Sequence, residues 1–582
     1  MKNYKKVYAA FILAGGLILH GCNGIFDDLA INPNQPSMGA YFTSPSAVND
    51  AVMTMYGYMS TQRCLGASGS KTTIIRSDEA SSNSDYGKPG MFGADLNASY
   101  YTIEQPYTLM YTTASQASYI IETAPSVDFS GNEELRNAYM GEAYFWRAFA
   151  HYYLLINFRN ISPIRQMPRN GDDYVRPLEK PAAVWNFIQE DLAHAKELLP
   201  VKGYWDSKNA GRVTKASAAA LLGKAYLYRS GIEQYYGEDK TTFYSEAAKE
   251  FGDVIDGKYG TYDLTKNYAD NFDVAHENNE ESILEFQFLG DVDNAGFNPG
   301  LATSGLAFDS RGLMLPGAGV GYEGVVHNWL YNAFVNSVDK DGYTDIRMFS
   351  TMIFNDLDAS IHLRNDAGGN LVRLEGPGGY KWEELYPAKN GKEGFATVSN
   401  PLAHSFKAGI RKGIDCSMPT QTEADGTPKL VGVGAGVKEY VYNQPRAHGV
   451  NWRYIRYADV LMMYAEAVVS GGTQASNMTP LQAVNKVRGR VNMSELPSVT
   501  MTDIQNERIL EFALEGHRFY DLLRWGKLAS RFTELQESDP NFKKFISADD
   551  FKGFVTNKHE WLPIPINELN SNPYITENNP GY

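Results

Sequence analysis

The chain has 582 residues, of which 68 are acidic and 53 are basic, and its formal net charge at pH 7 is −15. Such an acidic chain is a poor partner for nucleic acid, because a phosphate backbone binds basic surfaces. Its three cysteines are too few for a disulfide framework, and no cysteine–histidine cluster has the spacing of zinc ligands.

The first segment has the pattern of a secretory leader. Three lysines precede an apolar stretch over residues 7–19, which is too short to cross a bilayer as a helix of about 20 residues. Leu19-His20-Gly21-Cys22 looks like a bacterial lipobox, in which the cysteine receives a diacylglycerol. We therefore predict a signal peptide over residues 1–21 and lipidation of Cys22, which holds a protein on a membrane without spanning it. The alternative is an ordinary signal peptide with an incidental cysteine.

Five blocks have apolar residues at steps of three and four, which is the pattern of a helix with one buried face. The block after Thr214 also has a capping residue at its start and Gly231 near its end. The predicted helices cover residues 132–158, 214–231, 454–469, 480–491 and 504–528. The chain is therefore predicted to be mainly α-helical.

Two of these helices share a local sequence. LGKAY (222–226) fits the L-G-x-x-Y core of the first helix of a tetratricopeptide repeat, and MGEAY (140–144) is nearly the same. Ala247 and Phe251 fit the A-x-x-x-F of a second helix. In this motif the glycine admits the neighbouring helix and the tyrosine fills the space beside it. The two glycines are 82 residues apart (223 − 141), not the ~34 of a regular array, so we expect insertions between repeats.

Two stretches, 64–105 and 258–450, are rich in loop-forming residues, the second especially in Gly, Asn and Asp. We expect loops and short strands there, with residues 282–288 as a strand candidate. Loops this long in a folded chain are usually functional or disordered, and their aromatic residues argue against disorder. The helical scaffold is then assigned to residues of about 40–63, 106–257 and 453–530.

Six blocks along the chain carry a family resemblance. They are FDDLAINPN (26–34), EAYFWRAFAHYYLLINF (142–158), GRVTKASAAALLGKAYLY (211–228), YIRYADVLMMYAEAV (454–468), ERILEFALEGHRFYDLLRWGKL (507–528) and WLPIPINELNSNPYITENNPGY (561–582). Together they resemble the SusD/RagB family of surface lipoproteins, from the lipobox to the last residue. The last two blocks are the most specific.

The resemblance implies a tetratricopeptide-like helical scaffold with large irregular inserts that form the ligand face. It implies one domain over residues 22–582, ending in the family motif at 561–582. It also implies a SusC-like, TonB-dependent outer-membrane transporter as the partner that imports the captured ligand. Asp27 and Asp28 look like the acidic tag that sends such lipoproteins to the outer face of the outer membrane. We therefore expect a lipid-anchored protein exposed on a Gram-negative cell.

The charged residues of the predicted helices favour structure over catalysis. Glu507, Glu511 and Glu515 follow one another at four-residue steps with arginines between them, which is typical of ion pairs that tie helices together. Glycosidic acid–base work instead needs two acids ~5 to 9 Å apart across a cleft. The same interpretation covers Glu142, Arg147, Arg456, Asp459 and Glu466. His151 and His517 lie within such helices and are predicted to be hydrogen-bonded packing residues rather than ligands. No nucleophile elbow, phosphate-binding loop or HExxH helix is present in the sequence, so we do not expect an enzyme.

Sugar recognition needs aromatic planes for the C–H face of the ring and polar side chains for its hydroxyls. A buried hydroxyl left unpaired costs on the order of 1–3 kcal/mol. Both inserts hold these residue types, and in the family the corresponding loops commonly supply ligand contacts. The predicted ligand-binding residues are Arg76, Asp78, Tyr86, Phe92, Tyr101, Asn298, Tyr322 and Trp382. Four tryptophans in helical or terminal motifs are predicted to be core: Trp146, Trp329, Trp525 and Trp561.

The preferred hypothesis is a cell-surface glycan-binding lipoprotein that hands oligosaccharides to its transporter and catalyses no reaction. A second hypothesis keeps the scaffold and captures peptides, as the RagB branch does. A surface glycosidase and a scaffold lipoprotein without a ligand are the remaining alternatives. No cofactor is expected. Asp339-Lys340-Asp341-Gly342 permits a structural calcium ion, although solvated turn acids are the simpler explanation, and Cys64 and Cys416 permit one disulfide.

Overall fold

The computed structural model describes most of the helical chain and part of the inserts. The described residues are 42–61, 64–66, 69, 71–82, 92, 96–169, 171–288, 308–309, 323–354, 360–364, 408–412, 424, 430–433, 437–440, 447–448, 450–539 and 553–582. Several positions singled out above lie outside them: Cys22, Tyr86, Asn298, Tyr322, Trp382 and Cys416. Cys64 is a buried free thiol.

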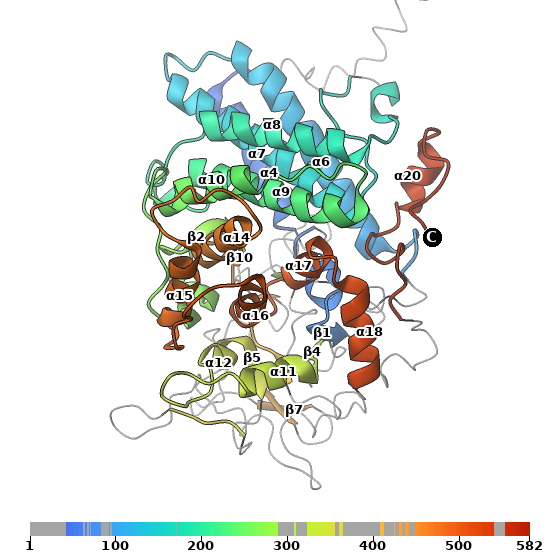
Figure 1. The fold of residues 1–582 in the computed structure, drawn as a ribbon. Helices are drawn as coiled ribbons and strands as arrows, with labels where there is room; N and C mark the ends of the chain where they lie inside the picture. The colour runs from blue at the N-terminus through green and yellow to red at the C-terminus, as the bar shows by residue number, and fades with distance from the viewer. Residues whose placement is uncertain are drawn as a thin grey trace, which may run out of the picture.

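The upper part of the molecule in Figure 1 is a stack of helices that lie side by side. Successive helices pack on one another from α4 to α10, and α14 continues the stack on α10. The helices of this stack are α4 (Pro45–Met59), α6 (Tyr101–Thr123), α7 (Glu133–Phe158), α8 (Pro181–Leu198), α9 (Lys215–Tyr236), α10 (Tyr244–Ile255), α14 (Tyr457–Val469) and α15 (Pro480–Arg490). The predicted mainly helical fold is therefore confirmed.

The glycines of the repeat sequence lie where two helices approach closely. A Cβ atom at Gly223 in α9 would lie 2.7 Å from a ring carbon of Phe251 in α10. A Cβ atom at Gly141 in α7 would lie 2.9 Å from Leu199, directly after α8. Because real Cβ atoms need more room than this, only glycine allows the two helix pairs to pack at this separation. The packing that the sequence predicted is confirmed.

The ends of α9 differ in how well the sequence predicted them. The predicted cap at Thr214 is confirmed, because its side chain and that of Ser217 form a reciprocal capping box. The predicted end near Gly231 is wrong, since α9 continues to Tyr236. Gly231 lies inside the helix, where a Cβ atom would lie 2.5 Å from the carbonyl oxygen of Arg524. This glycine therefore serves a helix contact rather than a helix end.

The central insert leaves and rejoins the scaffold at one place. Strand β2 (Ser282–Phe286) follows α10 and pairs antiparallel with β10 (Trp452–Arg456), which leads directly into α14. The strand predicted over residues 282–288 is thus confirmed. The helix predicted over 454–469 begins only at Tyr457, because residues 452–456 pair with β2. Pairing of the two ends allows α14 to pack on α10 despite the long insert.

A small antiparallel sheet joins the first insert to the central one. Its strand order is β1-β4-β6-β5, and the strands are β1 (Ala80–Ser82), β4 (Glu323–Val326), β6 (Ala408–Ile410) and β5 (Met352–Phe354). Two further pairs are β3 (Phe308–Asp309) with β9 (Ala447–His448), and β7 (Leu430–Val433) with β8 (Val437–Tyr440). The predicted loops and short strands of the inserts are therefore present among the described residues.

The range 504–528, predicted as one helix, holds two helices, and a third begins where the predicted range ends. α16 (Met501–Glu511) ends at a turn, α17 (Arg518–Arg524) follows, and α18 (Leu528–Ser538) begins after a second turn. In the first turn Leu514 and Gly516 have φ angles of 60° and 86°, which an α-helix does not allow. A Cβ atom at Gly516 would lie 2.9 Å from Thr73, so the close approach of the first insert favours glycine here.

The remaining elements are short and lie mostly around the inserts. They are α11 (Asn328–Val335), α12 (Arg347–Thr351), α20 (Ile566–Ser571), the π-helical turn η1 (Lys71–Ile75) and the 3-10 turns η3 (Ala124–Ser126), η4 (Gly171–Tyr174), η5 (Ser207–Asn209), η6 (Tyr268–Phe272) and η7 (Val274–His276). In Figure 1, α11 and α12 lie below α14, α16 and α17, and α20 lies at the side near the C-terminus. No described helix is long and apolar enough to cross a membrane.

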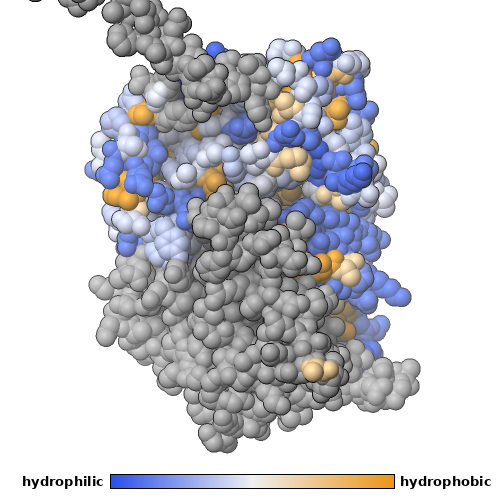
Figure 2. All heavy atoms as spheres, turned by 180° about the vertical axis from the view of Figure 1, so that it is seen from behind, coloured by the Kyte–Doolittle hydropathy of each residue, from blue (hydrophilic) through white to orange (hydrophobic). Residues whose placement is uncertain are grey.

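One hydrophobic cluster runs through the scaffold and into the described parts of the inserts. Trp146, Trp525 and Trp561 are buried in or against it, as predicted, whereas Trp329 is half-buried at its edge. Seen from behind, the described surface is mainly hydrophilic, with apolar residues scattered over it (Figure 2). The C-terminal segment around α20 is tied to α6 by a hydrogen bond from Asn567 to Glu104, and a pocket forms between them.

Candidate ligand-binding site

The predicted row of glutamates forms buried ion pairs. Arg347 of α12 binds Glu507 at 2.5 Å and Glu511 at 2.9 Å. Arg456 at the end of β10 binds Glu511 at 2.7 Å and Glu515 at 2.9 Å. Burial alone would raise the pKa of Glu511, but the neighbouring guanidinium groups outweigh it and lower that pKa. The structural interpretation of these acids is confirmed, because they tie the central insert to the scaffold through buried ion pairs. Glu515 also lines a small cavity of about 40 Å³.

The other predicted charged residues also pair inside the protein, and their partners come from other elements. The pairs are Glu142–Arg212, Arg147–Asp191, Asp459–Lys224, Asp459–Arg508 and Glu466–Arg524. His151 accepts the Ile164 backbone N–H through Nε2 at 2.9 Å and faces the Arg147 carbonyl through Nδ1 at 2.7 Å. His517 is buried beside Lys224. These residues therefore hold helices together, as the sequence predicted.

Arg76 and Asp78 were predicted to contact a ligand, and the structure corrects both predictions. Asp78 is 0% exposed, and its carboxylate receives N–H groups from Arg518 at 2.9 and 3.0 Å and from Arg531 at 2.7 Å. Arg76 is 1% exposed and donates to Asn157 and to two backbone carbonyls of the C-terminal segment. Both side chains join the first insert to the C-terminal part of the chain, which leaves them no surface for a ligand.

Phe92 is corrected for a similar reason. Its side chain is 3% exposed and packs edge-on against Phe532 and Phe554, with ring centroids 5.1 and 5.3 Å away. It also stacks on His559 at 4.8 Å. Phe92 therefore anchors the first insert on α18 and the C-terminal segment. Tyr86, Asn298, Tyr322 and Trp382 lie outside the described residues and stay predictions.

Among the predicted ligand residues that the structure describes, Tyr101 is the exposed one. It is the first residue of α6, 40% of its side chain is exposed, and its ring lies 5.3 Å from that of Tyr100. Residues three or four apart on a helix share a face. Tyr101 therefore lies on the stripe of α6 that continues through Glu104, Thr108 and Tyr111, and these three residues line a pocket.

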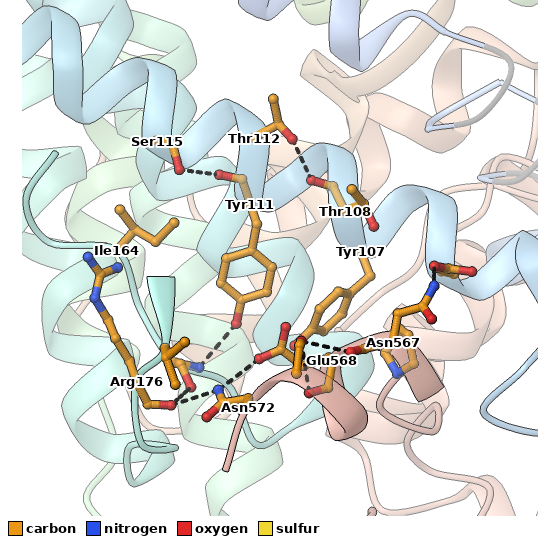
Figure 3. A pocket seen from close by; sticks show the side chains of 15 residues that line it. Tyr107, Thr108, Tyr111, Thr112, Ser115, Ile164, Arg176, Asn567, Glu568 and Asn572 are labelled. Carbon is orange, nitrogen blue, oxygen red and sulfur yellow. Dashed lines mark hydrogen bonds between the residues drawn. The ribbon is translucent and has the colours of Figure 1, made fainter. Parts of the chain in front are cut away.

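The pocket lies between α6, the segment 162–176 and the C-terminal helix α20 (Figure 3). We call it the α6–α20 pocket. Its volume is about 470 Å³, within the range of roughly 300–1,000 Å³ that is usual for small-ligand sites. It is lined by Glu104, Tyr107, Thr108, Tyr111, Thr112, Ser115, Ser162, Ile164, Val175, Arg176, Pro565, Asn567, Glu568, Ser571 and Asn572.

Hydrogen bonds fix the walls of the pocket. The buried amide of Asn572 donates to the Arg176 carbonyl at 2.9 Å and to Oε1 of Glu568 at 2.8 Å. The hydroxyl of Tyr111 accepts the backbone N–H of Ser162 at 3.1 Å. The amide of Asn567 in α20 donates to Glu104 in α6, which ties the C-terminal helix across the pocket. The walls are therefore preorganised by contacts that need no ligand.

The chemistry of the pocket is mixed. Tyr107 and Tyr111 form an aromatic wall, with ring centroids 4.9 Å apart. Burial raises the pKa of both phenols, so both stay protonated at neutral pH. Carboxylates, a guanidinium group, amides and hydroxyls complete the lining. Such a surface offers donors and acceptors beside an apolar plane, which suits a polyhydroxylated ring better than a purely apolar ligand.

Sequence reasoning missed Arg176, Glu568 and Asn572. The block 561–582 was used for its family resemblance, and the segment around Arg176 was assigned no role. A usable signal exists, because Glu568 and Asn572 are four residues apart and thus on one face of a helical turn. The local sequence does not indicate that this face lies against α6, because the contact between Asn567 and Glu104 joins segments more than 400 residues apart.

The carboxylates of the acidic turn Asp339-Lys340-Asp341-Gly342, which could bind calcium by sequence, already have partners within the protein. Oδ1 of Asp339 accepts the backbone N–H groups of Asp341 and Tyr343 at 2.9 and 3.0 Å. Arg364 forms ion pairs with both Asp339 and Asp341. Within the described residues, no group of three potential metal ligands comes together. A cation at this turn competes with Arg364 for the same oxygens.

Comparison with known proteins identifies relatives over the whole chain. The model of the SusD family matches residues 423–582, and a model described as starch-binding associating with outer membrane matches residues 31–227. A SusD-like protein of Bacteroides ovatus is 24% identical over 532 residues, which cover 90% of this chain and 83% of the relative. SusD-like protein P2 of Formosa agariphila is 25% identical and covers 100% of both chains.

Solved structures share the fold. A SusD superfamily protein from Bacteroides vulgatus has a TM-score of 0.66 at 22% identity and covers 93% of this chain and 100% of its own. A laminarin-binding SusD-like protein has a TM-score of 0.63 at 23% identity, with coverages of 93% and 100%. A structure with xylogluco-oligosaccharide has a TM-score of 0.61 at 20% identity, with coverages of 90% and 98%.

The fold thus defines a class of protein with a tetratricopeptide-like helical scaffold that carries large inserts. The chain belongs to the SusD/RagB family. Both predictions made from the sequence blocks, the family and the fold class, are confirmed. The assignment of residues 22–582 to one domain stays a prediction.

Proposed function

We propose that this protein is a cell-surface lipoprotein that captures oligosaccharides and delivers them to a SusC-like TonB-dependent transporter for import. The single observation that carries the proposal is membership of the SusD/RagB family, with one relative of the same fold described as laminarin-binding and another solved with xylogluco-oligosaccharide. The description of the second family model, starch-binding associating with outer membrane, supports the same cargo and place.

The proposed mechanism is capture without chemistry. Aromatic rings cover the C–H face of a sugar, and polar side chains pair with its hydroxyls. The proposed contacts are Tyr101, Tyr86, Asn298, Tyr322 and Trp382. The acids that could have served as catalytic pairs instead hold arginines inside the core, which supports binding over hydrolysis. Delivery follows when the lipoprotein closes over its transporter, and a lipid tether at Cys22 leaves the body free to swing.

A polysaccharide-binding assay that also detects cleavage products tests which ligand the protein binds. The mature protein is run by affinity electrophoresis through gels that contain laminarin, xyloglucan, starch or polygalacturonate, and each polysaccharide is then assayed for cleavage. We expect at least one polysaccharide to retard the protein and none to be cleaved. Peptides recovered by mass spectrometry from the purified complex, together with no retardation, would replace the glycan proposal with the peptide alternative. Cleavage products would establish the glycosidase.

A cellular experiment tests the anchor. Wild-type protein and Cys22→Ala are expressed with a metabolic fatty-acid label, and protease is added to intact cells. We expect label and surface cleavage for the wild type, and loss of the label for the variant. An unlabelled wild-type protein, or one that protease on whole cells leaves intact, contradicts the proposed location.

A further inference from the structure

The α6–α20 pocket is lined mainly by hydrogen-bond acceptors. Four hydroxyl groups of its lining donate their hydrogens to backbone carbonyls of the protein at 2.7–3.0 Å, those of Thr112, Ser115, Ser162 and Ser571. A hydroxyl whose hydrogen is already used keeps its lone pairs. These four groups therefore offer a ligand acceptors rather than donors.

Glu568 adds a carboxylate without a counter-charge. Among the described residues it forms no ion pair, and its carboxylate accepts one side-chain donor, the Asn572 amide at 2.8 Å. A carboxylate offers about four acceptor positions, so most of its capacity remains for a ligand. The side chain is half-buried, and a partly buried charge is screened less than one on the open surface.

Two tyrosines lie beside this carboxylate. Figure 3 shows the rings of Tyr107 and Tyr111 next to Glu568 on the same side of the pocket. Burial raises the pKa of both phenols, and the nearby charge of Glu568 raises it further. Both rings thus lie within the field of one carboxylate, and aromatic rings beside a negative charge attract a cation.

The positive charge of the pocket lies elsewhere. Figure 3 shows the guanidinium group of Arg176 beside Ile164, pointing away from Glu568. Glu104 adds a second carboxylate to the lining. Two carboxylates and one guanidinium group leave the pocket with a net negative charge, and the part around Glu568 has no cation of its own in contact.

A protonated primary amine fits the part of the pocket around Glu568. An ammonium group has three donors and no acceptor, and its hydrogen bond to a carboxylate is charge-assisted. A neutral hydroxyl donates once and brings lone pairs toward other acceptors, and a carboxylate is repelled. The volume of about 470 Å³ exceeds what an amine alone needs, so a larger body such as a sugar ring accompanies it.

We propose that the α6–α20 pocket binds an amino sugar, whose protonated amine lies against Glu568 and whose ring packs beside Tyr111. This inference rests on the proposed function and names a ligand class, glycans with unacetylated amino groups. It assigns that class to a site outside the predicted loop residues, with the C-terminal helix α20 as one wall.

Three matched oligosaccharides test the ligand class by calorimetry. The tetramers of β-1,4-linked glucosamine, glucose and N-acetylglucosamine share one backbone and differ at the second carbon, which carries an amine, a hydroxyl or an amide. Nα-acetyl-lysine amide presents an amine without a sugar ring. All titrations are made at about pH 6, because an amine with a pKa of roughly 8 is then protonated.

Variants of the mature protein test the site. Glu568→Gln removes the charge and keeps an acceptor for Asn572, and Glu577→Gln makes the same change at an exposed position of the C-terminal segment. Thr108 is exposed on α6 and lines the pocket, so Thr108→Trp obstructs it, and Thr54→Trp is the control on exposed α4. Melting temperatures show whether each variant is folded, and Glu568→Gln keeps the test valid if Thr108→Trp is unstable.

We expect the wild type to bind the glucosamine tetramer about tenfold or more tighter than the other two tetramers. Glu568→Gln and Thr108→Trp should lose this preference, and the two controls should keep it. Equal affinity for the three tetramers, or a preference that survives in folded Glu568→Gln, overturns the site. Binding of the lysine amide as tight as that of the glucosamine tetramer, and lost in Glu568→Gln, overturns the amino-sugar class in favour of peptides.

The proposed function is judged separately, by laminarin and xyloglucan oligosaccharides. Binding of these neutral glycans together with equal affinity for the three tetramers rejects the amino-sugar site and leaves the proposed function standing. If no oligosaccharide of any kind binds the wild type, the proposed function fails and the amino-sugar site fails with it.

Discussion

Arg456 and Glu511 form an ion pair of 2.7 Å in which both side chains are 0% exposed. The pair joins the strand that closes the central insert to the end of α16. Arg347 from α12 shares the same carboxylate, so one buried glutamate holds three parts of the chain together. The inserts that face ligands in the proposed function are therefore fastened to the scaffold by buried charges and by the hydrophobic core.

Removal of one member of this network should destabilise the protein strongly. In Glu511→Gln the buried Arg347 and Arg456 each lose one of their counter-charges, and we expect a loss of about 3–5 kcal/mol in the free energy of unfolding. Urea denaturation followed by circular dichroism measures it. The control is Glu133→Gln, which breaks the exposed pair with Arg136 on α7 and should hardly move the midpoint. Equal losses in the two variants would show that burial does not determine the effect.

The repeat glycine offers a test of helix packing. Gly223→Ala places a methyl group where the ring of Phe251 lies, and we expect a destabilisation of about 1–3 kcal/mol from overpacking. Gly57→Ala in α4 has nothing within 4 Å of the new methyl group and should stabilise by about 0.5–1 kcal/mol through helix propensity. Thermal melts of the two variants should shift in opposite directions. The double variant Gly223→Ala with Phe251→Leu should recover part of the loss, and no recovery would place the strain elsewhere.

Stability should fall as the pH drops from neutrality, in two stages. Burial lowers the pKa of His151 to about 3, whereas its ordinary value is near 6.5. Between pH 6.5 and pH 3 the imidazole is therefore protonated in the unfolded chain but neutral in the folded chain. The contribution of His151 to stability is complete above pH 6.5 and is lost as the pH falls toward 3. This histidine contributes a slope of up to about 1.4 kcal/mol per pH unit in that window.

The second stage comes from carboxylates. Burial would raise the pKa of Asp521, but Arg508 and Arg524 outweigh it and lower it to about 2. Stability from this carboxylate is complete above its unfolded pKa near 4 and is lost as the pH falls toward 2. Urea midpoints at each pH unit from 7 to 2 measure both stages. His151→Gln should flatten the slope between pH 6 and 4, and an unchanged slope in that variant would assign it to other groups.

The exposed aromatic residue at the start of α6 should contribute to binding without contributing to stability. Tyr101→Ala removes a ring that can stack on a sugar, and we expect oligosaccharide affinity to fall about five- to tenfold. Its melting temperature should stay at the wild-type value, because the side chain is 40% exposed. Tyr235→Ala removes a tyrosine that is 54% exposed on α9 and is the matched control. If calorimetry gives the same oligosaccharide affinity for both variants, Tyr101 does not contact the ligand.

Local sequence determined the elements whose signals are local. The helix over 132–158, the cap at Thr214 and the strand after residue 281 follow from periodicity, capping chemistry and β-branched or aromatic runs, and all three are present. The glycines of the repeat sequence predicted close helix contacts, because a residue without a side chain inside a helix allows a neighbouring helix to approach. The family followed from six blocks in order.

Tertiary structure decided the rest, because it depends on partners that lie far along the chain. Periodicity continues through residues 512–517, but the helix is interrupted there, where Leu514 and Gly516 have positive φ angles and Glu79 and Thr73 of the first insert meet them. Asp78 looks like a ligand residue by composition, but Arg518 and Arg531 reach it from the other end of the chain and bury it. Likewise, the wall that Glu568 forms with Arg176 exists only because α20 folds back onto α6. A sequence pattern reports the periodicity of one segment, whereas burial and charge pairing are properties of two segments that meet.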